Sequence, residues 1–133
     1  MVNLYKSIVL FSYLVYVLVF FIPYLDPYLY EQETRGVLSW TGYGALIELH
    51  NSVSYIFLIA YSIALYGMIQ FRAWARPLFV TLTVMSIISN GVQGINVFTA
   101  IDSVLTYLTN LADGATIVLM YLTSVSNKFK KYT

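Results

Sequence analysis

Four apolar runs constrain this chain more than any other feature of its sequence. They cover residues 8–24, 51–71, 78–100 and 104–124. Each run has about the 17 to 25 residues that an α-helix needs to cross the roughly 30 Å hydrocarbon core of a bilayer. Because a chain in lipid must satisfy its own backbone polar groups, runs of this length predict helices. The sequence therefore predicts an all-α integral membrane protein, folded as a four-helix bundle.

The composition agrees with a single transmembrane domain over residues 1–133. Of these residues 59% are hydrophobic and only 10% are charged, which is more apolar than soluble domains usually are. The expected spans are about residues 7–25, 46–71, 77–100 and 103–125, with a long loop over residues 26–45. The net charge of +1, carried by scattered cations, argues against a nucleic-acid partner. The absence of cysteine excludes disulfides and thiolate metal sites.

The positions of the cations predict the orientation in the bilayer. One side of the predicted spans carries Lys6, Arg72, Arg76, Lys128, Lys130 and Lys131, whereas the other side carries only Arg35. Cytoplasmic loops are enriched in lysine and arginine, so the positive-inside rule places both termini in the cytoplasm. The loop over residues 26–45 then lies outside. Arg72 and Arg76, with Trp74 between them, form a predicted anchor at the cytoplasmic headgroups.

The outer loop is rich in aromatic residues. Asp26 is a favourable N-cap for a short helix from Pro27 to Arg35, which Gly36 would end. The predicted outer interface consists of Tyr28, Tyr30, Trp40, Tyr43 and His50. Rings with one polar end favour the headgroup layer, so these residues fit an interfacial belt. The alternative is a recognition surface for a partner or an apolar ligand.

Polar residues recur at helical spacing on the third and fourth spans. The third carries Asn90, Gln93 and Asn96 on one face, and the fourth carries Asn110 and Asp113. A short connection between the spans predicts an antiparallel hairpin. Asn90 would then face Asp113, and Gln93 would face Asn110.

These side chains predict a polar cleft that opens outward, with Asp113 at its base. The second span adds Glu48 and Asn51 near the outer end. Inserting a carboxylate in the middle of a span costs about 2.5 to 3.5 kcal/mol. We therefore expect Asp113 to be neutral and to donate a hydrogen bond to Asn90. The cleft has two interpretations: hydrogen bonds that hold helices together, or a binding site for a cation, a proton or a polar ligand.

The sequence predicts no catalytic site, no metal site and no cofactor. His50 follows Glu48 by two residues, so on a helix the two side chains point about 200° apart and cannot share a metal ion. No serine or threonine has a base at a recognisable spacing. We expect a protein that is not an enzyme.

Two short segments resemble a known family. The first is Trp74, Ala75, Arg76, Pro77, Leu78 and Phe79, and the second is Tyr121, Leu122, Thr123 and Ser124, followed by Phe129. They resemble a family of short four-helix bacterial inner-membrane proteins of unassigned function, whose members share a W-A-R-P-L-F-like turn. In size and topology the chain is also similar to immunity proteins against pore-forming bacteriocins. The resemblance implies a multi-pass protein of the bacterial inner (plasma) membrane.

These features favour two functions over a third, a membrane enzyme, for which Glu48 and His50 are the only candidate groups on the outer side. The first is a small non-enzymatic membrane protein that acts through helix contacts with another membrane protein or with itself, as an accessory subunit, an assembly factor or an immunity factor. The second is a small ion, proton or polar-solute transporter or channel subunit, which would use the polar cleft around Asp113. In both, the lipid bilayer is the first partner.

Overall fold

Helices make up all the regular secondary structure in the part of the chain that the computed structural model describes, residues 1–47 and 52–130. They are α1 (Val2–Leu29), α2 (Gln32–Leu38), α3 (Ser52–Ile69), α4 (Ala75–Val92), α5 (Ala100–Leu122) and α6 (Ser126–Lys130). Four of them, α1, α3, α4 and α5, are long and apolar enough to cross a membrane. The predicted all-helical membrane protein is therefore confirmed at this level.

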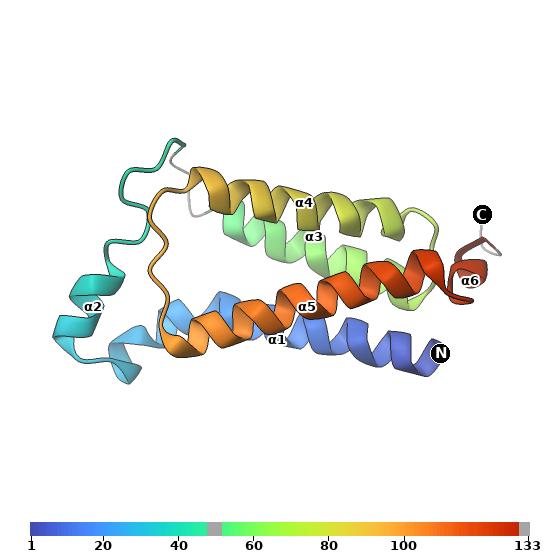
Figure 1. Cartoon of the computed structure of the whole chain (residues 1–133), viewed down its shortest axis with the longest axis horizontal. Helices are drawn as coiled ribbons and strands as arrows, with labels where there is room; N and C mark the ends of the chain where they lie inside the picture. The colour runs from blue at the N-terminus through green and yellow to red at the C-terminus, as the bar shows by residue number, and fades with distance from the viewer. Residues whose placement is uncertain (48–51, 131–133) are drawn as a thin grey trace.

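The four long helices form two packed pairs. α5 packs along α1, α4 packs along α3, and contacts between α1 and α3 join the pairs (Figure 1). α4 and α5 lie close only near α6, where the Arg76 guanidinium stacks over the Tyr121 ring at 4.1 Å. Towards the α2 end the two helices diverge (Figure 1). The third and fourth spans therefore do not form the tight hairpin that the sequence predicts.

The connection between α4 and α5 explains this difference. α4 ends at Val92 rather than near residue 100, because Gly94 adopts a positive φ of 82° that interrupts the helix. α5 starts afresh at a capping box, in which Thr99 and Asp102 bond each other's backbone N–H groups. A loop therefore separates the two helices and lets their ends stand apart.

α1 is longer than the predicted first span. It continues through Pro23 and Pro27 to Leu29, and Asp26 lies inside it rather than capping a new helix. Each proline removes one backbone donor, so the carbonyl oxygen four residues earlier, that of Val19 or Pro23, loses its helical partner. The separate short helix of the outer loop is α2, and Gly36 lies within it instead of ending it.

The loop that follows α2 and the loop between α4 and α5 are joined by backbone hydrogen bonds. The Gly42 amide donates to the carbonyl oxygen of Ile95 at 2.8 Å, and the Ile95 amide donates to that of Tyr43 at 3.0 Å. Leu46 extends the contact with a bond from its amide to the Val92 carbonyl at 2.9 Å. The approach is so close that a Cβ atom on Gly94 would lie 2.5 Å from the Tyr43 carbonyl oxygen.

An aromatic cluster closes the opposite end. Tyr5 of α1 stacks on Phe71 at 5.8 Å between centroids, and Phe129 of α6 meets both rings edge-on. The Arg76 guanidinium lies over Phe129 as well as Tyr121. Such cation–π contacts contribute about 0.5 to 2 kcal/mol each. The start of α1, the α3–α4 turn and α6 are thereby held at one end of the molecule (Figure 1).

Gly94→Ala is expected to destabilise the protein by about 2 kcal/mol or more. The new Cβ atom clashes with the Tyr43 carbonyl oxygen, and an L-residue at positive φ costs about 1 to 2 kcal/mol in addition. The measurement is thermal unfolding of the detergent-solubilised protein. Gly36→Ala is the control, because it lies in α2 with open space around the added methyl group. Equal stability of the two variants would contradict the tight approach of the loops.

Candidate functional site

Asp113 lies at the centre of a buried polar cluster. It is only 4% exposed and sits near the middle of α5, facing α1 and α3. The Ser12 hydroxyl of α1 donates to Asp113 Oδ1, and the Tyr61 hydroxyl of α3 donates to Oδ2 at 3.5 Å. Both carboxyl oxygens therefore accept bonds from hydroxyl groups on other helices. These bonds provide the compensation that a polar group needs in an apolar interior.

Tyr61 extends this cluster towards α4. Its hydroxyl is 3.4 Å from Thr83 Oγ1, and its ring stacks on Tyr16 at 4.6 Å between centroids. Phe79 meets the Tyr61 ring edge-on at 5.8 Å. Thr116, one turn beyond Asp113, is fully buried, and its hydroxyl has no hydrogen-bond partner among the described residues. We call Ser12, Tyr61, Thr83, Asp113 and Thr116 the buried polar cluster.

The predicted partner of Asp113 was therefore wrong. Asn90 does not face Asp113, because α5 pairs with α1 and turns its carboxyl towards Ser12. The sequence does carry a signal for this arrangement: Ser12 and Tyr16 lie one turn apart in the otherwise apolar first run.

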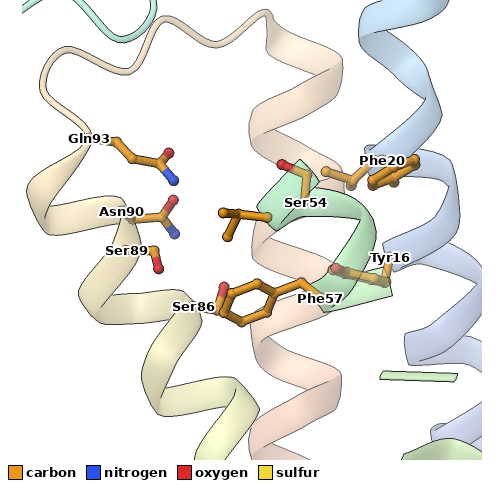
Figure 2. Close-up of a pocket in the computed structure, with 10 residues that line it drawn as sticks. Tyr16, Phe20, Ser54, Phe57, Ser86, Ser89, Asn90 and Gln93 are labelled. Atoms are coloured by element: carbon orange, nitrogen blue, oxygen red, sulfur yellow. The ribbon is translucent and has the colours of Figure 1, made fainter. Parts of the chain in front are cut away.

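A separate pocket of about 270 Å³ lies between α1, α3 and α4, in the half of the molecule nearer α2 (Figure 2). Its lining consists of Tyr16, Val19, Phe20, Val53, Ser54, Phe57, Ser86, Ser89, Asn90 and Gln93. Asn90 and Gln93 belong to the predicted cleft, and their side chains point from α4 towards Ser54 (Figure 2). The structure therefore brings two of the predicted carboxamides together, but places Asp113 elsewhere.

Tyr16 connects the two polar regions. Its side chain lines the pocket, and its ring stacks on Tyr61, which donates to Asp113. Thr83 also approaches the Tyr61 hydroxyl from α4. The pocket and the buried polar cluster are therefore neighbours separated by a pair of tyrosine rings.

Two further residues of the predicted cleft, Asn96 and Asn110, do not line the pocket. Asn96 Nδ2 donates to the backbone oxygen of Asn90 at 3.3 Å in the α4–α5 connection. Asn110 is exposed on α5, and its side chain makes no hydrogen bond to another described residue. Glu48 and Asn51, with His50, lie outside the described residues.

The described residues of the predicted outer interface lie at the α2 end. Tyr28 is 87% exposed, Tyr43 is 75% exposed, and Trp40 is also on the surface. Tyr30 is half-buried, since its hydroxyl donates to Thr99 Oγ1 at 3.2 Å across to the start of α5. Three aromatic side chains are thus available to headgroups or to a partner at this end.

The residues of the predicted cytoplasmic anchor differ in their surroundings. Arg72 is exposed, and its Nε atom lies 3.4 Å from the Gln70 side-chain oxygen. Trp74 packs over Gly67, where an added Cβ atom would lie 2.6 Å from the indole ring. Arg76 turns inward over the aromatic cluster. Of the two arginines in this predicted anchor, only Arg72 therefore projects outward from the protein.

Comparisons and metal-binding potential add no further assignment. No protein-family model, curated protein or solved structure matches the chain. Within the described residues, no group of three or more histidine, cysteine, aspartate or glutamate side chains is placed to hold a metal ion. The chemistry of the two polar regions is therefore the basis for any function.

Ser12→Ala is expected to destabilise the protein by about 1 to 2 kcal/mol, because it removes a hydroxyl donor from a buried carboxyl group. Unfolding of the purified protein in mixed micelles, followed by circular dichroism, measures this loss. Ser7→Ala is the matched control, since Ser7 is exposed on the same helix. If both variants unfold alike, the Ser12–Asp113 contact contributes nothing to stability.

Proposed function

We propose that this chain is a small non-enzymatic membrane protein that acts through helix contacts with another membrane protein. One observation carries the proposal: the Asn110 carboxamide is exposed on α5. It lies about 15 Å from the start of this helix, at a depth where lipid offers no hydrogen-bond partner. A second transmembrane helix that supplies a donor or an acceptor would satisfy this group.

The surroundings of Asn110 suit a helix partner. Gly114, one turn further along, has open space where a side chain would extend, which allows a second backbone to approach closely. Tyr107 and Leu111, on the same face, are each 73% exposed. We call Tyr107, Asn110, Leu111 and Gly114 the α5 face. It combines one polar group for specificity with apolar groups for packing.

The proposal includes a topology. We infer a four-helix bundle in the bacterial inner membrane with both termini in the cytoplasm. The cations Lys6, Arg72 and Lys128 support this orientation, because all three belong to the end formed by the start of α1, the α3–α4 turn and α6 (Figure 1). In this setting the chain would serve as an accessory subunit, an assembly factor or an immunity factor.

Asn110→Leu is expected to release the partner. Affinity capture of the tagged chain from native membranes should recover a stoichiometric membrane protein, or a second copy, and Asn110→Leu should reduce that recovery at least about tenfold. Asn3→Leu is the matched control, because Asn3 is exposed near the start of α1. A monodisperse chain with no companion, or capture that survives Asn110→Leu, would refute the proposal.

A second candidate is a proton or cation pathway. It is favoured by a series of contacts that runs from the pocket through Tyr16 and Tyr61 to Asp113. These contacts connect the pocket to a carboxyl group near the middle of α5. Ionisable groups at this depth mark ion and proton paths in many membrane proteins.

This candidate predicts flux that depends on Asp113. Proteoliposomes loaded with a pH-sensitive dye should show proton uptake under an imposed membrane potential, and Asp113→Asn should abolish it. Glu33→Gln is the control, because Glu33 is exposed on α2. If vesicles that contain the unmodified protein take up protons no faster than protein-free vesicles, a proton pathway is excluded.

A further inference from the structure

The pocket between α1, α3 and α4 has two chemically distinct walls. The α4 wall is polar and consists of Ser86, Ser89, Asn90 and Gln93. The wall formed by α1 and α3 is mainly apolar, with Val19, Phe20, Val53 and Phe57, and adds the hydroxyl groups of Tyr16 and Ser54. A ligand that fits both walls must carry hydrogen-bonding groups on one side and hydrocarbon on the other.

The polar wall has unused hydrogen-bonding capacity. Neither the Asn90 nor the Gln93 carboxamide bonds to another described side chain, and both point into the pocket (Figure 2). Each carboxamide offers two N–H donors and an oxygen acceptor. Both side chains lie within one turn of the end of α4, and Asn90 is exposed, so they are free to bond a ligand that arrives at this end of the helices. A ligand with hydroxyl and carbonyl groups would satisfy both.

The charge of the lining selects the kind of ligand. All ten described lining residues are uncharged side chains. Moving an unpaired charge into a region of low dielectric constant costs several kcal/mol, and the charge needs an opposite charge nearby to offset this. The lining supplies hydrogen bonds without a counter-ion, so it suits an uncharged headgroup.

The size of the pocket and its exposure indicate where the ligand comes from. A pocket of about 270 Å³ is smaller than the roughly 300 to 1,000 Å³ of pockets that hold a whole drug-sized ligand, so it suits a headgroup rather than a whole lipid. Ser54 and Asn90 are exposed, so the pocket opens at the surface of the helices. The hydrocarbon tail of a bound amphiphile could therefore remain in the bilayer.

We propose that this pocket binds the uncharged headgroup of a neutral glycerolipid. Asn90 and Gln93 bond the glycerol hydroxyls and the ester carbonyl, while Phe20 and Phe57 contact the adjoining part of the acyl chain. The site lies on α1, α3 and α4, and the α5 face takes no part in it. Lipid binding and partner binding therefore fail independently of each other.

Three probes with the same acyl chain test the headgroup. The full chain in detergent micelles is heated with equal mole fractions of monoolein, methyl oleate or oleate. Monoolein should raise the midpoint of thermal unfolding by roughly 4 °C or more, as expected for a ligand well above its dissociation constant. Methyl oleate lacks the hydroxyls and oleate carries a charge, so both should give less than half that shift. Equal shifts for all three probes would overturn the proposal.

Two variants test the pocket itself. The double variant Asn90→Leu, Gln93→Leu should lose the monoolein shift, whereas Asn3→Leu should keep it. Gln93→Leu alone keeps the Asn90 carboxamide and should at least halve the shift. It is the test to use if the double variant does not fold, because Gln93 lies just beyond the last residue of α4. A monoolein shift that persists in Gln93→Leu and in the folded double variant would place the lipid elsewhere. Capture of a membrane partner through the α5 face should be unchanged in these variants.

Discussion

The hydrogen bonds that Ser12 and Tyr61 donate to Asp113 join three of the four long helices at one point. In lipid, apolar side chains give little preference for one helix neighbour over another, so hydrogen bonds and close packing decide which helices pair. Asp113 directs α5 onto α1, and Tyr61 brings α3 to the same place. The pairing of the remaining helix follows, since α4 is left to pack on α3.

The pocket is a consequence of that pairing. The buried residues of α4 are Ala75 and Phe79, both near α6, so the helix is held firmly only at that end. Towards α2 it diverges from α5, and its polar side chains face the space beside α1 and α3 (Figure 1). One buried carboxyl group thus determines both the stable core and the position of the region open to ligands. The α5 face remains on the outside because α5 uses its other side to contact α1.

The sequence was sufficient to predict the helical class and the four long apolar helices. Hydropathy and helical spacing are local properties, so they survive in the structure. The partner of Asp113 was not predictable in this way, because it depends on how α5 rotates against α1. The end of α4 at Val92 was missed for a related reason: residues 93–99 are apolar enough to extend a helix, but Gly94 and the Thr99 capping box break it.

The unequal lengths of the long helices have a consequence for the surrounding bilayer. At about 1.5 Å per residue, the 28 residues of α1 span about 42 Å, whereas the 18 residues of α3 and of α4 span about 27 Å. The whole length of α1 exceeds the thickness of the hydrocarbon layer, whereas the lengths of α3 and α4 fall slightly short of it. The apolar run of α1, residues 8–24, is about as short as α3 and α4, so the extra length of α1 lies at its two ends, around Lys6 and Asp26, and creates no mismatch with the hydrocarbon layer. In a bilayer the ends of α1 would therefore project into the headgroup layers, and Tyr28 and α2 would lie beyond the level at which α4 ends.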